Sequence, residues 1–167
     1  NGALQYSYDG ELRLSGVQVQ AGGTQLGTEF AWDDDSLLTR AGALNLSRDP
    51  GNGLVTQTSA GVVSTQHTYS AYGEPERFVA QVNGATLYEY ELMADDLGRI
   101  TSKRESIEGV MSQTEYSYDV AGRLSEVSVD GAFVASYTYD ANGNRTMKTT
   151  PSGATAARSD SAAAAER

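Results

Sequence analysis

Apolar and polar residues alternate along much of this chain, in short runs separated by turn-forming residues. LSEVSV at 124–129 has the period of two that is typical of a β-strand. Asp130-Gly131 follows this run and Asn83-Gly84 follows FVAQV. Such dipeptides are strong hairpin signals, because both central residues of the turn need positive φ. With no helical period, the pattern predicts an all-β chain of roughly fourteen short strands, paired as successive antiparallel hairpins.

A second kind of turn recurs along the chain. The motif Tyr-x-Tyr-Asp-x-x-Gly occurs in YSYDVAGR at 116–123 and again in YTYDANG at 137–143. When the aspartate is taken as the anchor, related segments have their anchors at residues 9, 33, 49, 70, 95, 119 and 140. Internal repeats of this length are typical of stacked repeat architectures. We therefore interpret residues 1–150 as about seven repeats, and the alanine-rich stretch 151–167 as a low-complexity, flexible tail with at most a marginal helix at 162–167.

Each anchor residue has a local role in this interpretation. An aspartate at the start of a turn accepts hydrogen bonds from the backbone N–H groups that follow it. The glycine three residues later is expected to adopt the left-handed conformation that closes a type I turn with a bulge. The arginine after it is expected to pair with acids across the hairpin, an exposed contact worth about 0–1 kcal/mol.

The aromatic residues before each anchor come in pairs that are two residues apart and so share one face of a strand. The pairs are Tyr6 with Tyr8, Phe30 with Trp32, Tyr88 with Tyr90, Tyr116 with Tyr118, and Tyr137 with Tyr139. Cross-strand aromatic packing contributes about 0.5–1.5 kcal/mol per pair, and we favour this structural role. The alternative is a platform of exposed rings that stacks on sugars.

The residues expected to build the repeats are therefore the aromatic pairs, the turn aspartates and the glycines and arginines that follow them. They are Tyr6, Tyr8, Asp9, Phe30, Trp32, Asp33, Tyr69, Gly73, Tyr88, Tyr90, Asp95, Gly98, Arg99, Tyr116, Tyr118, Asp119, Gly122, Arg123, Tyr137, Tyr139, Asp140, Gly143 and Arg145. The less regular copies have Asp49 with Gly53, and Ser70 in the aspartate place.

Composition narrows the classes of function. The net charge is −10 and 12 Lys and Arg residues are scattered among 22 acids, which disfavours nucleic-acid binding. Cysteine is absent, so disulfides and thiolate metal sites are excluded. No apolar run approaches the roughly 18 residues of a membrane-spanning helix, so we expect no membrane insertion. Hydrophobic residues make up 39% of the chain and charged residues 20%, as in a folded domain rather than a disordered one.

Residues for catalysis or cofactor binding are not evident. His67 is the only histidine and lies in the alternating segment STQHTYS, where a strand-surface role is favoured. The acidic runs at 33–35 and 95–96 fall at turn positions, although a glycosidase would need two carboxylates about 5–10 Å apart in a cleft. Asp140, Asn142 and Asn144 alternate as in a calcium loop, but the glycine and the distal glutamate of that loop are missing. We expect no enzyme, no cofactor and no metal.

YSYDVAGRLSEV and YTYDANGNR resemble the YD-repeat, or RHS-repeat, family of bacterial RHS proteins, Tc toxin shell components and teneurins. LLTRAGALNLSRDPGNGLVTQT, YSAYGEPERF and LGRITSKRESIEG also resemble bacterial teneurin-like members. The resemblance covers about residues 1–150. It implies a spiralling β-shell of tandem hairpins that encloses or presents a C-terminal toxin or effector domain, in a secreted or surface-associated bacterial protein.

The partners implied by this resemblance are neighbouring repeats and an enclosed domain of the parent polypeptide, and sugar binding has been suggested for such repeats. Two features of the family are not found in this sequence. One is a C-terminal autoproteolysis segment of the Asp-Pro-x-Gly type, for which Asp49-Pro50-Gly51 in mid-repeat should not be mistaken. The other is a toxin domain after the repeats. Cleavage and toxicity are therefore not transferred to this chain.

Overall fold

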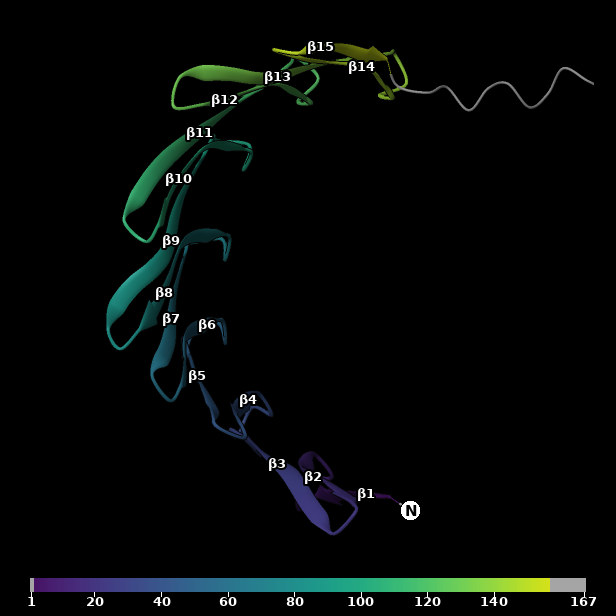
Figure 1. Ribbon diagram of the computed structural model, residues 1–167, viewed down its shortest axis with the longest axis vertical. Helices are drawn as coiled ribbons and strands as arrows, with labels where there is room; N and C mark the ends of the chain where they lie inside the picture. The colour runs from purple at the N-terminus through teal and green to yellow at the C-terminus, as the bar shows by residue number, and fades with distance from the viewer. Residues whose placement is uncertain (1, 157–167) are drawn as a thin grey trace, which may run out of the picture. The chain divides into compact units, whose positions relative to one another are not determined.

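A computed structural model describes residues 2–156, which form fifteen β-strands and no helix (Figure 1). The strands are β1 (Ala3–Tyr8), β2 (Leu14–Ala21), β3 (Thr24–Trp32), β4 (Leu38–Ala41), β5 (Leu44–Arg48), β6 (Val55–Ala60), β7 (Val63–Tyr69), β8 (Pro75–Val82), β9 (Ala85–Ala94), β10 (Ile100–Ile107), β11 (Val110–Tyr118), β12 (Leu124–Val129), β13 (Ala132–Tyr139), β14 (Arg145–Thr150) and β15 (Gly153–Ala156). Their order in the sheet is their order along the chain. The predicted all-β fold of tandem antiparallel hairpins is confirmed.

The chain divides into two compact units. The first runs to Glu89 and includes Ile107–Gly109, and the second comprises Tyr90–Ser106 and the residues from Val110 onward. In the first unit, β1 to β8 pair successively in antiparallel fashion. In the second unit, β11 to β15 do the same. Each unit is thus built from contacts between strands that are adjacent in sequence.

At one end, the hairpins from β2 to β13 turn through two-residue loops that contain glycine, whereas the β14–β15 loop is Pro151-Ser152. Asn83-Gly84 has φ values of 52° and 79°, and Asp130-Gly131 has 51° and 76°. Positive φ at both central residues defines the type I′ turn, whose twist matches that of the flanking strands. Both dipeptides lie where the sequence predicts hairpin turns, and Glu108-Gly109 forms a further turn of the same type.

The opposite ends of the hairpins turn at the seven anchor positions. In the turn at Asp119, the Asp119 N–H donates to the Arg123 carbonyl at 2.8 Å and the Gly122 N–H donates to the Asp119 carbonyl at 2.9 Å. The other six anchors start turns closed by equivalent backbone bonds, although the loop at Asp49 is one residue longer. Gly122 has φ 78°, which is the left-handed conformation expected three residues after the anchor.

The two faces of the sheet differ in polarity. In the second unit, direct cross-strand pairing places Tyr116 beside Val127 and Val127 beside Ala135, which makes an apolar row. The next row, on the opposite face, contains Ser117, Glu126 and Ser136. In the first unit, the pairing of β7 with β8 places His67 beside Phe78 and Tyr69 beside Pro75. The alternation in the sequence therefore separates an aromatic face from a polar one.

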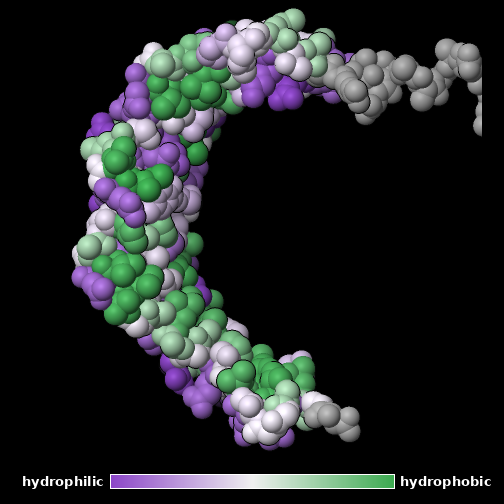
Figure 2. All heavy atoms as spheres, in the orientation of Figure 1, coloured by the Kyte–Doolittle hydropathy of each residue, from purple (hydrophilic) through white to green (hydrophobic). Residues whose placement is uncertain are grey.

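Few side chains are fully buried within residues 2–156. Val79 in the first unit and Ala135 in the second are the buried apolar residues found there, and Ser106 is the buried polar one. Large apolar side chains such as Leu26 and Val110 remain exposed, and Figure 2 shows apolar patches between polar ones on the surface viewed. In the described part of the chain no second layer of secondary structure packs on the sheet, so such residues are left largely exposed and hydrogen bonds carry much of the order.

One boundary differs from the sequence prediction. Strand β15 pairs with β14, with Thr150 opposite Gly153, so the regular structure continues six residues into the stretch 151–167 that was expected to be flexible. The alternation of GATA is too short to be recognised as a strand, and it is formed by pairing with β14. Residues 157–167, including the expected marginal helix at 162–167, lie outside the described residues.

Leu12 provides a test of the turn geometry. It occupies the glycine position of the first anchor turn with φ 64°, and its side chain is 83% exposed. A left-handed conformation costs a non-glycine residue about 1–2 kcal/mol, so we expect Leu12→Gly to raise the free energy of unfolding by about 1 kcal/mol. Urea denaturation followed by circular dichroism measures the change. Leu12→Ala keeps the strain and should match the parent, and an equal gain for both variants would contradict this explanation.

Candidate functional site

The side chain of each turn aspartate first stabilises its own turn. Asp119 Oδ1 accepts hydrogen bonds from the Ala121 N–H at 3.0 Å and from the Arg123 N–H at 2.9 Å. The equivalent oxygens of Asp9, Asp33, Asp95 and Asp140 accept the same two bonds. Ser70 does so with its hydroxyl oxygen, from Tyr72 and Glu74. The motif therefore needs a short oxygen-bearing side chain at this position.

The second carboxylate oxygen holds the arginine that ends the turn. Arg123 Nε donates to Asp119 Oδ2 at 2.7 Å, and Arg99 and Arg13 make the same bond to Asp95 and Asp9. The sequence predicts that these arginines pair across the hairpin, and the structure corrects this: their partner is the aspartate of their own turn. The spacing of four residues in a closed turn brings the two groups together.

The oriented arginine then contacts the next hairpin. Arg123 Nη1 donates to the Asp140 carbonyl at 3.0 Å, and its guanidinium carbon lies 4.7 Å from the centroid of the Tyr139 ring. Arg13 Nη1 likewise donates to the Asp33 carbonyl at 2.9 Å. A guanidinium over an aromatic face gains about 0.5–1 kcal/mol at exposed sites. One arginine thus links two successive turns.

In four of the turns, the aromatic residue just before the anchor completes the link from the other side. The Tyr139 hydroxyl donates to the Leu124 carbonyl at 2.8 Å, one residue after Arg123. Equivalent bonds run from Tyr118 to the Ile100 carbonyl and from Tyr69 to the Val55 carbonyl. In Trp32 the donor is the indole N–H, which bonds the Leu14 carbonyl at 2.9 Å. We call the aspartate–arginine pair, together with the aromatic donor of the next turn, the inter-hairpin contact.

The first aromatic position of each pair serves packing instead. Tyr116 and Tyr137 lie opposite Val127 and Lys148 in the sheet, and Tyr6 lies opposite Val17. Phe30 lies opposite Ala41. His67 takes this position before Ser70, where its ring meets Phe78 edge-on at 5.0 Å and its Nε2 shares a hydrogen bond with Thr65 Oγ1.

Three sequence assignments shift in the structure. Leu92 and Ala94 hold the two places before Asp95, so Tyr88 and Tyr90 lie further up β9. Tyr88 packs near Phe78 with the ring centroids 6.0 Å apart, and Lys103 lies over the Tyr90 ring. In the last turn, Asn144 rather than Arg145 holds the arginine place and donates from Nδ2 to Asp140 Oδ2 at 3.0 Å. At these places the residue type resembles that of the other repeats, but its distance from the anchor aspartate differs.

The bond from the residue before an anchor to a carbonyl of the preceding hairpin also forms without an aromatic donor. Arg48 lies immediately before Asp49 and donates from Nε to the Leu38 carbonyl at 3.2 Å and from Nη1 to the Gly53 carbonyl at 2.8 Å. The aromatic pairs of the sequence do not indicate this residue, because it is not aromatic. The signal available in the sequence was its place immediately before an aspartate and a glycine.

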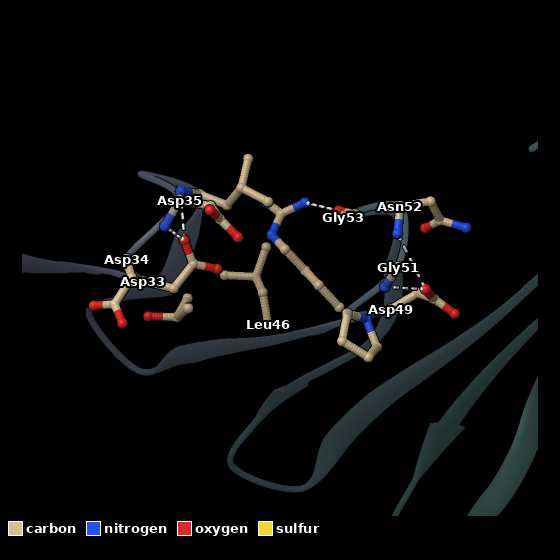
Figure 3. Close-up of a pocket in the computed structure, with 12 residues that line it drawn as sticks. Asp33, Asp34, Asp35, Leu46, Asp49, Gly51, Asn52 and Gly53 are labelled. Carbon is tan, nitrogen blue, oxygen red and sulfur yellow. Dashed lines mark hydrogen bonds between the residues drawn. The ribbon is translucent and has the colours of Figure 1, made fainter.

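Leu37 holds the arginine place in the turn before Asp49, and a hollow of about 610 Å³ opens beside it. Figure 3 shows the acidic turn 33–35 on one side of this hollow and Asp49 with Asn52 on the other. Asp33 and Asp49 both direct their Oδ1 atoms to the backbone of their own turns. Within residues 2–156, no group of three or more His, Cys, Asp or Glu side chains is arranged to hold a metal ion.

Hydrogen bonding lowers the pKa of four turn aspartates, Asp9, Asp95, Asp119 and Asp140. The pKa of Asp95 lies below its ordinary 3.8, chiefly because the Arg99 side chain donates to it, and that of Asp140 is lowered chiefly by the Asn144 side chain. For Asp119 the Arg123 backbone N–H is the largest cause, followed among the lowering ones by the Arg123 side chain. At Asp9 partial desolvation is the largest single influence and opposes the shift, but the bonds from Arg13 together lower the pKa.

The sequence profile of the teneurin YD-shell family matches residues 1–158. This chain belongs to the teneurin YD-shell family. Human teneurin-4 is 28% identical to the YD-shell chain over 148 residues, and Drosophila melanogaster teneurin-m is 27% identical over 142 residues. These alignments cover 86% and 84% of the chain but 5% of each relative, so the chain spans a small part of their length.

Solved structures also resemble the YD-shell chain. A crystal structure of TcdB2-TccC3-TEV aligns with a TM-score of 0.49 at 15% identity, over 90% of this chain and 10% of that one. A porin-like protein from Bacteroides uniformis aligns with a TM-score of 0.44 at 12% identity, over 87% of this chain and 79% of that one.

Within residues 2–156, no helix is long and apolar enough to span a membrane.

Removing one hydroxyl tests the inter-hairpin contact of the YD-shell chain. Tyr139→Phe leaves the Leu124 carbonyl without its donor, so we expect the free energy of unfolding to fall by about 1 kcal/mol. Tyr116→Phe is the matched control, because Tyr116 packs at the first aromatic position and should tolerate the loss with a much smaller change. Urea denaturation of both variants gives the comparison, and equal losses would show that the hydroxyl bond has no special role.

The lowered aspartate pKa values make stability of the YD-shell chain depend on pH. A carboxylate whose pKa is lower in the folded state contributes fully above its unfolded value and loses that contribution as the pH falls through the folded value. We therefore expect stability to decline below about pH 4, and Asp119→Asn to show a shallower decline than the parent. Urea midpoints measured at a series of pH values test this. Asp34→Asn, a change at an exposed acid in another turn, should keep the parental slope.

Proposed function

We propose that this chain is a non-catalytic segment of a YD-repeat β-shell, whose wall encloses or presents a C-terminal domain of a longer polypeptide. The observation that supports this most directly is the inter-hairpin contact. Its arginine guanidinium, its carboxylate and its tyrosine hydroxyl all bond within the array. Groups used in this way at turn after turn build a wall, whereas a binding or catalytic site needs groups left available for a ligand.

The two-faced sheet also supports a wall. One face is aromatic and aliphatic, yet its side chains are only partly covered, and some of them, such as Tyr6 and Tyr8, are more than half exposed. Apolar surface exposed on this scale is unfavourable in water and is typical of an interaction surface. A domain held against that face, within a closed shell, would remove it from solvent. The family name itself denotes a shell, which is a structural assembly.

The location and the cargo follow from the same proposal. A secreted or cell-surface bacterial protein, with a toxin or effector as the enclosed domain, agrees with the resemblance to RHS and Tc shell proteins. The acidic charge of −10 keeps such a wall soluble and repels nucleic acid. Neighbouring repeats and the enclosed domain are therefore the proposed partners.

Glycan recognition is the second candidate function, and one observation favours it. Tyr6 and Tyr8 form an aromatic pair on β1 whose side chains are 52% and 59% exposed, and Tyr72 at a turn tip is 91% exposed. Exposed rings can stack on the C–H faces of sugars. The pairs further along the chain are more covered, so any platform of this kind would be confined to the first hairpin and that turn tip.

Protease protection in the complete gene product tests the shell. If the wall encloses the domain that follows it, that domain should resist protease while the repeats are folded and become cleavable in Asp119→Ala, which removes the turn carboxylate. Asp34→Ala, at an exposed acid outside the inter-hairpin contacts, is the control and should preserve protection. A following domain that is cleaved equally fast in parent and variant would argue against enclosure.

A glycan array with the 167-residue chain separates the two candidates. The scaffold function predicts no binding above background and no change for Tyr6→Ala combined with Tyr8→Ala. The glycan function predicts binding that this double variant abolishes while circular dichroism shows an intact sheet. Glycan binding that the double variant abolishes would favour sugar recognition over the scaffold function.

A further inference from the structure

Three Asn-Gly dipeptides lie within the described residues, at Asn52, Asn83 and Asn142, and all three asparagines are exposed. Asn-Gly is prone to a spontaneous reaction. The backbone nitrogen of the glycine loses its proton and attacks the side-chain Cγ of the asparagine, a C–N bond forms, and ammonia leaves. Water then opens the five-membered succinimide ring at either carbonyl, which gives aspartate or isoaspartate. No oxidant or enzyme is needed.

The attacking nitrogen is engaged in two of the three sites. The Gly53 N–H donates to the Asp49 carbonyl at 2.8 Å, and the Gly143 N–H donates to the Asp140 carbonyl at 3.1 Å. Asn52 is held further, because its Oδ1 accepts the Leu54 N–H at 2.9 Å. These bonds belong to the anchor turns, so the same geometry that closes those turns protects the nitrogen. A bonded N–H must first open before it can be deprotonated and attack.

Gly84 is placed differently. It is the second central residue of a type I′ turn, with φ 79°, and no acceptor for its N–H is found within residues 2–156. A Cβ built at Gly84 would meet no atom within 4 Å, so the space beside its Cα is open, as it also is at Gly143. Asn83 is fixed in the left-handed region with φ 52°. The type I′ turn at Asn83-Gly84 therefore leaves the reactive nitrogen of Gly84 without a hydrogen bond to protect it.

We propose that Asn83 is a site of deamidation in the folded chain, with water as the co-reactant, and that it reacts faster than Asn52 and Asn142. The aspartate product fits the turn, because Asp130-Gly131 forms the same turn with nearly the same φ values of 51° and 76°. The isoaspartate product does not, since it adds a methylene to the backbone of a two-residue loop. The reaction adds one negative charge to the tip of the β8–β9 hairpin in either case.

Peptide mapping by mass spectrometry tests the order of reactivity. The intact chain is incubated in mildly alkaline buffer, with and without denaturing urea, and aspartate and isoaspartate are quantified at each Asn-Gly site. In the folded chain, Asn83 should react about five-fold faster than Asn142, as expected if a bond worth about 1 kcal/mol protects the latter. In urea the three sites should react at similar rates, because glycine follows each of them.

Two outcomes would overturn the proposal. The first is that Asn83 reacts no faster than Asn142 in the folded chain. The second is that Asn83 reacts faster than Asn142 by the same factor in urea as in the folded chain. Asn83→Asp is the matched variant for the product. Its urea midpoint should equal that of the parent when both are fresh, whereas aged parent enriched in isoaspartate should unfold at lower urea. A destabilised Asn83→Asp would contradict the comparison with Asp130.

Discussion

The stacking of the hairpins depends on the carboxylate of the turn aspartate, whose two oxygens bind different groups. In the turn at Asp119, Oδ1 binds the backbone of its own turn and Oδ2 binds Arg123, which then reaches the next turn. The described sheet buries few side chains. Burial of apolar surface alone therefore contributes little to holding successive hairpins in place. Charge-assisted hydrogen bonds are among the stronger polar contacts, and here they are placed where successive hairpins meet.

This arrangement makes stability a property of neighbouring hairpins. Each inter-hairpin contact joins turns that follow one another along the chain, and the strands pair in chain order within both units. Repeat arrays of this kind behave approximately as a sum of repeat stabilities and nearest-neighbour terms. A weak copy, such as the one with Leu37 in the arginine place, is therefore tolerated if the copies beside it are intact, since Arg48 still bonds the Leu38 carbonyl.

The sequence was sufficient for the parts of the structure that local chemistry determines. Asp-x-x-Gly and Asn-Gly specify their turns through φ and through bonds to nearby N–H groups, so the anchors and hairpins could be predicted. The bonds from Tyr139 to the Leu124 carbonyl and from Arg123 to the Asp140 carbonyl could not be predicted, because they join adjacent hairpins and depend on how two turns stack. Tyr88 and Asn144 show a related difficulty. Residue type suggested one alignment, whereas distance from the anchor decides which atom reaches the carboxylate.

Within residues 2–156, the inter-hairpin contacts lie at the aspartate ends of the hairpins and not at the opposite, glycine ends. Hairpin length varies accordingly: β4 and β5 have four and five residues, whereas β2 and β3 have eight and nine, yet Arg48 and Trp32 make equivalent bonds at the aspartate end. Residues can thus be inserted or deleted at the glycine ends without disturbing the opposite edge. Over evolution, the edge formed by the aspartate turns would keep its geometry, whereas the lengths of the hairpins at the other edge could vary.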